Sequence, residues 1–219
     1  MTGIKRESPV RFSARALKTE MRDHWSVALE YADEGSGPWV VDLAHKQRWD
    51  LQDKQIGKLT PCGLAVPAEP GSCTFAQDML VNRMNRTQTS IYHLGSETPA
   101  MPEVPGYTDV SESTVFLGLF GPQIFSMAEK LTNLDFMAPG KNPPFLYQGP
   151  FCRIPCQVVT LQKNPDYSGG FLLTASRGYG ESLIHAIMDA GAEFGLRPAG
   201  ENRFQAWAKG LQGGARTAG

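Results

Sequence analysis

The chain has 219 residues, with 21 Lys and Arg against 22 Asp and Glu, so its formal net charge is −1. This length suffices for one large or two small domains whose apolar core needs neither disulfide nor metal. The basic residues are scattered along the sequence, which argues against an extended nucleic-acid footprint and against an anionic membrane surface as a partner.

The first 37 residues are charged and only weakly periodic. We interpret 1–37 as an N-terminal arm with a short helix around 14–21. Basic and acidic residues alternate here without an apolar run of signal-peptide length, so we expect a cytoplasmic protein.

A first α+β unit is predicted at 38–95. Residues 39–51, WVVDLAHKQRWDL, follow the turn signal EGSGP and are rich in Val, Leu and Trp, which predicts a strand with a bend. Prolines and glycines in 61–72 indicate a loop. The alternating stretch 73–95 predicts two antiparallel strands that turn near 85–87.

Residues 96–113 contain three prolines and form the best candidate for a linker. A second α+β unit is predicted at 114–204. It would hold a strand at 115–119, a helix from Gly121-Pro122 to about Leu131, strands within 145–162 and 169–176, and a closing helix at 178–194. The glycine-rich remainder, 205–219, is expected to be a flexible tail.

Strands joined by antiparallel hairpins, with only two long helical segments, predict an α+β fold rather than a doubly wound parallel sheet.

The Gly178-x-Gly180 corner has the first two glycines of a phosphate-binding loop. A dinucleotide fingerprint needs a third glycine where Leu183 stands, and no Walker sequence occurs. Local structure explains the residues better, with Ser176 as a helix cap and Gly195 closing the helix in the left-handed conformation. The apolar face of this helix would be formed by Leu183, Ile184, Ile187, Met188, Gly191 and Phe194.

Cysteines occur at 62, 73, 152 and 156 without zinc-ribbon spacing. Cys152 and Cys156 are four residues apart, which predicts that they share one face of a strand, and two buried reduced thiols are favoured there over a metal site. His45 follows Asp42 by three residues. This pair could orient an imidazole as a general base, but no nucleophile is evident for it, and a structural histidine is the favoured interpretation.

The run NRMNRTQTS at 82–90 gathers amide, guanidinium and hydroxyl groups in an otherwise apolar hairpin. Within it, Arg83, Asn85 and Arg86 are the candidate cofactor-binding residues. These groups could bind an anionic or heterocyclic ligand, or could satisfy polar groups at a subunit interface.

Three stretches together resemble the aminomethyltransferase (glycine-cleavage T-protein) superfamily. WVVDLAHKQRWDL resembles its "DLSH" segment, FLGLFGPQIFSMAEKLTNLDF resembles its Gly-Pro strand–helix unit, and 169–200 resembles its closing strand, helix and "GLRPAG" turn. Over about 38–200, the short length, KLTNLDF and NRTQTSIYHLG most resemble the gamma subunits of heterotetrameric sarcosine oxidases and of related N-methyl amino acid dehydrogenases.

This resemblance implies two similar α+β halves with antiparallel sheets and packed helices, lacking the C-terminal barrel of full-length relatives. It also implies an auxiliary, non-catalytic subunit of a flavin-dependent oxidoreductase complex that oxidatively demethylates sarcosine or another N-methyl amino acid. The one-carbon unit would pass to tetrahydrofolate. The alpha, beta and delta sister subunits would hold FAD, FMN, NAD, zinc and tetrahydrofolate.

The sequence departs from the folate-binding relatives at the position where they carry a glutamate that binds the pterin. Here Gly170-Phe171 is followed by Leu172, which cannot make those hydrogen bonds. The serine of "DLSH" is Ala44. We therefore expect no cofactor on this chain alone, no catalytic residue and no metal.

The alternative is an autonomous folate-dependent aminomethyl or methyl transferase, or a folate-binding protein. In that case Arg83, Asn85 and Arg86 would form the ligand site, with Asp42 or His45 in an acid–base role.

Overall fold

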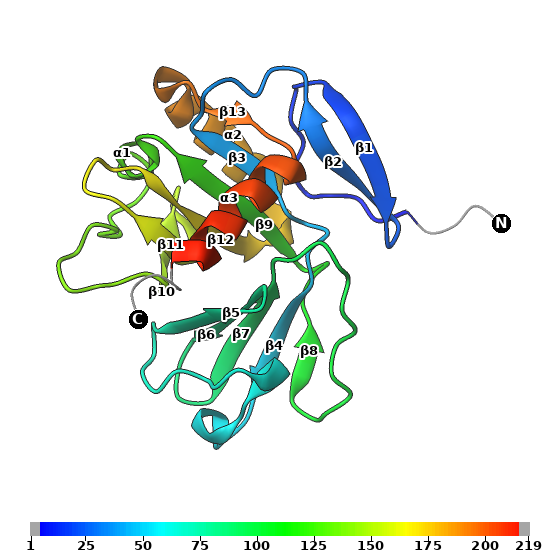
Figure 1. Cartoon of the computed structure of the whole chain (residues 1–219), viewed down its shortest axis with the longest axis vertical. Helices are drawn as coiled ribbons and strands as arrows, with labels where there is room; N and C mark the ends of the chain where they lie inside the picture. Colours follow the sequence, from blue (N-terminus) through cyan, green and yellow to red (C-terminus); the bar gives the residue numbers. More distant parts are fainter. Residues whose placement is uncertain (1–4, 215–219) are drawn as a thin grey trace.

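A computed structural model describes residues 5–214 and contains a six-stranded, a five-stranded and a two-stranded sheet. Figure 1 shows the five-stranded sheet below the six-stranded sheet, with the two-stranded hairpin to one side. The predicted α+β class with antiparallel sheets and packed helices is confirmed, and the described residues form no closed barrel.

The N-terminal hairpin consists of β1 (Ala16–Arg22) and β2 (Trp25–Tyr31), which pair antiparallel. The helix expected at 14–21 is therefore wrong. Every second residue of β2 is buried, namely Trp25, Val27 and Leu29, and pairing with this half-buried strand outweighs the local helical preference of the preceding segment.

The six-stranded sheet has the order β10-β11-β12-β9-β3-β13. Its strands are β3 (Trp39–Asp42), β9 (Thr114–Gly121), β10 (Phe145–Phe151), β11 (Ile154–Lys163), β12 (Gly169–Ser176) and β13 (Arg197–Pro198). Neighbours pair antiparallel, except that β13 pairs parallel with β3.

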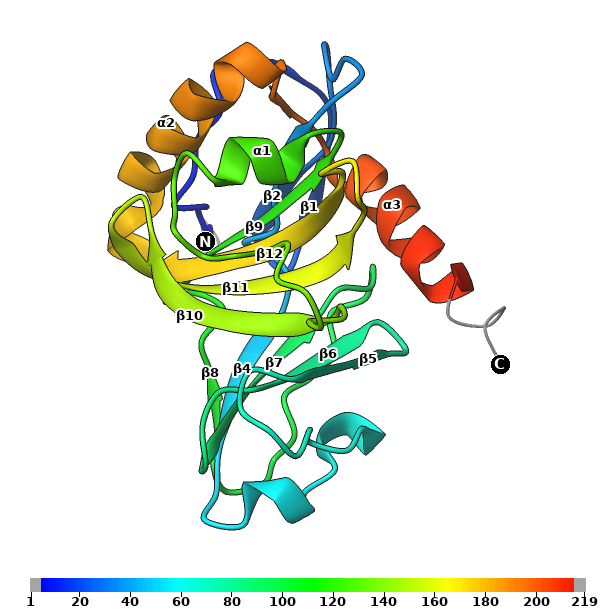
Figure 2. The same ribbon diagram turned by 90° about the vertical axis from the view of Figure 1, so that its left-hand side faces the viewer.

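Helices cover both faces of this sheet, as Figure 2 shows. One face of the sheet is covered by α1 (Ile124–Ala128) and α2 (Gly180–Gly191), which pack against β9 and β12. The expected apolar stripe of α2 is confirmed, because its members are buried in this core or pack against it. Short 3₁₀ turns at Arg177–Tyr179 and Ala192–Phe194 flank α2, and Gly195 is left-handed as predicted.

The other face of the sheet packs against α3 (Glu201–Gly214) and against the five-stranded sheet. That second sheet has the order β5-β6-β7-β4-β8, and all its pairs are antiparallel. Its strands are β4 (Arg48–Gln52), β5 (Cys73–Ala76), β6 (Met79–Arg83), β7 (Gln88–His93) and β8 (Tyr107–Asp109). A loop with 3₁₀ turns at Ile56–Lys58 and Pro61–Gly63 contributes Ile56 and Val66 to the core on its outer side.

The boundaries of the sheets differ from those expected for the two units. β3, expected in the unit at 38–95, pairs with β9 and β13 of the other sheet. β8 lies inside the expected linker 96–113 and pairs with β4. These memberships are set by pairing between distant segments, which local patterns do not reveal.

The segment expected to be a flexible tail, 205–219, is helical as far as Gly214, and the segment expected to be an arm, 1–37, contains the paired strands β1 and β2. α3 continues to Gly214 because Phe204 and Ala208 are buried in the core between the sheets. Residues 1–4 and 215–219 lie outside the described residues. In the described part of the chain, no helix is both long and apolar enough to cross a membrane.

Candidate functional site

The bend predicted in 39–51 is the crossing of the chain from β3 to β4, that is, from one sheet to the other. Leu43 N–H donates to the carbonyl of Phe116 (2.9 Å), and Lys46 N–H donates to the carbonyl of Leu43 (2.8 Å). This turn places three consecutive polar side chains, His45, Lys46 and Gln47, in the interior. Because charged groups are almost never fully buried unless they are paired, their partners define the candidate site.

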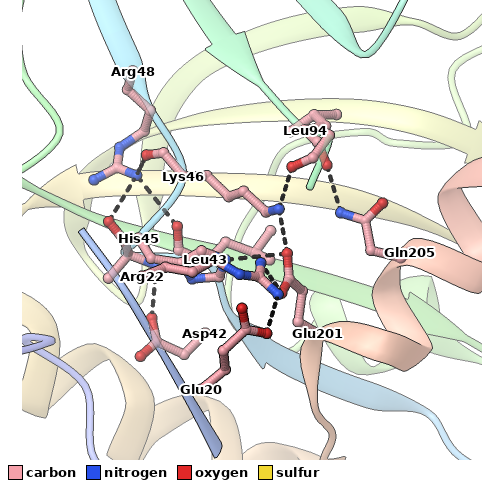
Figure 3. Close-up of polar contacts among 12 residues, drawn as sticks. Glu20, Arg22, Asp42, Leu43, His45, Lys46, Arg48, Leu94, Glu201 and Gln205 are labelled. Atoms are coloured by element: carbon pink, nitrogen blue, oxygen red, sulfur yellow. Dashed lines mark hydrogen bonds and ion pairs between the residues drawn. The ribbon is translucent and has the colours of Figure 1, made fainter. Parts of the chain in front are cut away.

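The central partner is Glu201, the first residue of α3, which is 2% exposed. Its carboxylate accepts hydrogen bonds from the Lys46 ammonium and from the Arg22 guanidinium, and lies 3.2 Å from Nε2 of His45 (Figure 3). We call Arg22, His45, Lys46 and Glu201 the Glu201 cluster. Lys46 also donates to the carbonyl of Gly95, so its charge is held between two acceptors.

The environment of the Glu201 cluster favours a charged carboxylate and a neutral imidazole. Burial opposes ionisation of Glu201, but His45 and Lys46 outweigh it and hold the pKa of Glu201 well below its ordinary value. For His45, burial has the largest effect and lowers its pKa, although Glu201 partly offsets it. The cluster thus joins the hairpin, the crossing and α3 by buried ion pairs.

Arg48, the first residue of β4, is fully buried and bonded to backbone oxygens instead of a carboxylate. Its guanidinium donates to the carbonyl of Lys46 (2.6 Å), to Oγ1 of Thr114 (2.9 Å) and to the carbonyl of Ser111. It also lies 4.8 Å from the ring centroid of Phe116. These contacts fasten the end of the crossing to the start of β9.

Asp42, at the end of β3, lies next to a cavity that is also lined by residues of β2 in the hairpin. Its Oδ1 accepts a hydrogen bond from the backbone N–H of Ala44 (2.9 Å). Together with His45 and Tyr31 it lines this cavity of about 150 Å³ beneath β2, which we call the Asp42 cavity. Burial raises the pKa of Asp42 and is the main cause that raises the pKa of Tyr31 to about 12.

The structure therefore brings Asp42 and His45 close together, as their spacing suggested. His45 lies between the Asp42 cavity and Glu201, a residue 156 positions away that the sequence did not connect with it. Local signals for Glu201 were its place in the first turn of a helix and the polar run HKQR at the crossing, but neither identifies a partner so distant.

Arg83, Asn85 and Arg86 lie elsewhere, at the β6–β7 turn. Because Gln52 pairs with Gln88 and Arg48 pairs with Tyr92, this turn is at the end of β4 remote from the crossing. Arg83 donates to the carbonyls of Asn85 (2.6 Å), Arg86 (3.1 Å) and Pro67 (3.4 Å).

The Asn85 side chain also forms hydrogen bonds within the β6–β7 turn. It accepts a hydrogen bond from Thr87 N–H (2.9 Å) and donates to Oε1 of Gln88 (3.0 Å). Arg86 is exposed. Two of the three candidate residues thus shape the turn that carries them.

Leu172, which stands where folate-binding relatives carry a glutamate, lies in the interior of the protein. Leu172 is 1% exposed and packs in the apolar core between the two sheets. Thr174, on the same face of β12, lines a cavity of about 170 Å³ with Tyr92 and Gln157. Pockets for ligands of cofactor size measure roughly 300–1,000 Å³.

The Gly178-x-Gly180 corner leads into α2, as expected, but without the expected helix cap. Ser176 makes no side-chain cap hydrogen bond, so that expectation is wrong, and the 3₁₀ turn at Arg177–Tyr179 leads into α2 instead. All four cysteines are free thiols, and Cys156 is buried as expected. The expectation that Cys152 shares a strand face with it is wrong, because Cys152 lies in the turn between β10 and β11 and is only partly buried. Within residues 5–214 no three His, Cys, Asp or Glu side chains gather in a way that could hold a metal ion.

No protein-family model matches the chain, and no curated protein matches it. Among solved structures, it is similar to a chain of the heterotetrameric sarcosine oxidase from Corynebacterium sp. U-96, solved in complex with pyrrole 2-carboxylate. The TM-score is 0.58 at 16% identity, and the match covers 71% of this chain and 84% of that chain. The likeness shows a shared fold, and the matched chain is the shorter of the two.

Proposed function

We propose that this protein is an auxiliary, non-catalytic subunit of the gamma type in a sarcosine oxidase-like complex. The observation that carries the proposal is the likeness to one chain of a heterotetrameric sarcosine oxidase over 84% of that chain. Because the match covers most of one chain of a multi-subunit complex, it favours a subunit role over that of an autonomous transferase.

The candidate site supports a structural role for this chain. In the Glu201 cluster the two carboxylate oxygens are bound by cations of the same chain, and the Lys46 ammonium is shared between Glu201 and Gly95. Groups engaged in this way are buried and already paired, whereas an acid or base needs to reach a substrate. Holding elements together is the function that this geometry favours.

The surface of the hairpin supports a role in assembly. Leu17 and Met21 on β1 are each 61% exposed, and β1 is an edge strand whose outer backbone groups can accept a further strand. Trp25 and Phe204, two aromatic residues near the ends of the chain, do not provide such a surface, because both are buried in the protein.

In this proposal the chemistry takes place in the alpha, beta and delta sister subunits. These would hold FAD, FMN, NAD, zinc and tetrahydrofolate and would oxidatively demethylate sarcosine or another N-methyl amino acid, in the cytoplasm. The present chain would hold none of these groups, in keeping with the apolar surroundings of Leu172.

Affinity purification of the tagged full-length chain from its native source tests the proposal. We expect stoichiometric flavoprotein subunits, a flavin absorbance spectrum, and release of a one-carbon unit from sarcosine or another N-methyl amino acid. Elution of the chain alone would contradict the proposal.

Titration of the isolated chain with tetrahydrofolate tests the alternative of an autonomous transferase. We expect no saturable change in intrinsic tryptophan fluorescence, because Leu172 offers no hydrogen bond to a pterin. Saturable micromolar binding would favour the transferase and count against the subunit role.

A further inference from the structure

The Asp42 cavity is a mostly enclosed space of about 150 Å³, and His45 is the one member of the Glu201 cluster that lines it. Its walls come from three parts of the chain: the segment at Ser8 and Val10, the strand β2, and the end of β3 with the crossing. A volume of this size accommodates about five water molecules or one ligand the size of benzene.

One wall of the cavity carries the carboxyl group of Asp42, which has no paired cation in the described part of the chain. Burial raises the pKa of Asp42, and a cation bound beside it would favour the ionised carboxylate. Asp42 forms no ion pair with any described residue. The nearby cations are engaged elsewhere: Arg22 and Lys46 bind Glu201, and Arg48 is bonded to backbone carbonyls.

The other groups that face Asp42 across the cavity are uncharged near neutral pH. The pKa of Tyr31 is about 12, and burial lowers the pKa of His45. Ser8 and Ser26 contribute hydroxyl groups, while Val10, Trp25 and Val27 form an apolar side.

We infer that the Asp42 cavity binds a small organic ammonium ion with a short alkyl group, of the methylammonium class. The charge of the ion would balance Asp42, its N–H groups would donate to the carboxylate and to neighbouring hydroxyl or phenol oxygens, and its alkyl part would contact Val10, Trp25 and Val27. A ligand that bears a carboxylate is disfavoured, because a second negative charge would raise the pKa of Asp42 further, whereas a cation would stabilise its ionised form. This inference is independent of the proposed subunit role.

Methylammonium chloride is the probe, titrated into the full-length ¹⁵N-labelled chain at constant ionic strength. We expect saturable shifts of the amide signals of Ser26, Ala28 and Ala44, and none of similar size with sodium acetate or with sodium chloride. Shifts that do not saturate, or that acetate reproduces, would overturn the inference.

Asp42→Asn removes the charge while keeping an oxygen that can accept the Ala44 N–H. Asp109→Asn is the matched control, because Asp109 likewise accepts the N–H of the residue two positions on, Ser111 (2.8 Å), but is exposed and away from the cavity.

We expect Asp42→Asn to weaken methylammonium binding at least about tenfold, as loss of a charged hydrogen-bond partner does, and Asp109→Asn to leave it unchanged. Equal binding by both variants would refute the role of Asp42. If Asp42→Asn does not fold, the comparison of methylammonium with acetate on the unaltered chain still decides the question.

Discussion

At the scale of single residues, Glu201 makes the contacts that join the hairpin, the crossing and α3. Three side chains from two separate parts of the sequence, Arg22 in the hairpin and His45 and Lys46 at the crossing, meet on one buried carboxylate. Removing one member of a buried ion pair leaves the other charge unpaired, and this costs far more than loss of an exposed pair.

We therefore expect Glu201→Gln to lower the free energy of unfolding by about 3–5 kcal/mol, because Lys46 would be buried without its partner. Urea unfolding followed by far-UV circular dichroism measures this. The matched control is Glu193→Gln, which breaks the exposed ion pair between Lys130 and Glu193 and should cost less than about 1 kcal/mol. Similar losses in the two variants would show that the Glu201 cluster is not stabilising.

His45 gives the stability a defined pH dependence. In the folded chain burial lowers the pKa of His45 below 6.5, whereas the unfolded chain has the ordinary value. As the pH falls below 6.5, the unfolded chain binds a proton that the folded chain does not, so stability decreases, by at most about 1.4 kcal/mol per pH unit.

Urea unfolding at pH 5, 6 and 7 should show a smaller decrease for His45→Asn than for the unaltered chain. His93, whose pKa burial also lowers, remains in both proteins and contributes equally to each. The pH slope, rather than the absolute stability, is the readout. An unchanged slope in His45→Asn would contradict the assignment.

The closeness of Asp42 and His45 could be predicted from their spacing, because three residues in a bend stay near one another. Glu201 could not, since nothing local links a helix start to a crossing more than 150 residues earlier. The buried positions of Lys46 and Arg48 were equally hidden, because their types are normally those of a solvated surface.

At the scale of elements, the Gly178-x-Gly180 corner shows why one of its two glycines is needed. A Cβ on Gly180 would overlap the carbonyl oxygen of Pro9, whereas a Cβ on Gly178 would meet no atom within 4 Å. The N-terminal segment thus packs directly against the first turn of α2, and the second glycine makes this approach possible.

Gly180→Ala should lower the free energy of unfolding by about 1–3 kcal/mol, because the segment at Pro9 must shift away from α2. Gly178→Ala, two residues away, should leave it unchanged or raise it by up to about 1 kcal/mol. Thermal and urea unfolding of the two variants provide the comparison. Equal stability would mean that the contact with Pro9 contributes nothing.

Elements with local patterns were predictable, and those that depend on distant packing were not. The hairpin of β6 and β7 and the stripe of α2 follow from alternation and from helical spacing in adjacent residues. α3 has three glycines in its fourteen residues and a weak stripe, so its helical form depends on burial of Phe204 and Ala208.

At the scale of the whole molecule, the exposed strand β1 is the surface that the proposed subunit role would use. Leu17 and Met21 are exposed in this chain and would become buried on assembly.

The double change Leu17→Lys and Met21→Lys should leave the melting temperature of the isolated chain within about 2 °C, since surface changes have small effects. In affinity purification it should reduce the flavoprotein recovered by at least about tenfold, as loss of interface anchors does. The control is Val104→Lys, a similarly exposed position in a loop, which should leave recovery unchanged. Undiminished recovery with the double variant would place the interface elsewhere.

For the whole molecule, the sequence did not predict which strands belong to which sheet. An apolar stretch such as 39–51 indicates strands but does not say which strands will be their neighbours. The crossing after Asp42 divides one predicted strand between two sheets, and this moves the boundary between them.

The position of β3 between β9 and β13 also sets the order in which the protein can be completed during synthesis. After the N-terminal hairpin, β3 leaves the ribosome before all the strands of the five-stranded sheet, and its two neighbours, β9 and β13, follow those strands. The five-stranded sheet can therefore form while β3 still lacks both of its partners. Until the segment ending at Pro198 has emerged, an apolar strand edge stays open to chaperones or to unwanted pairing.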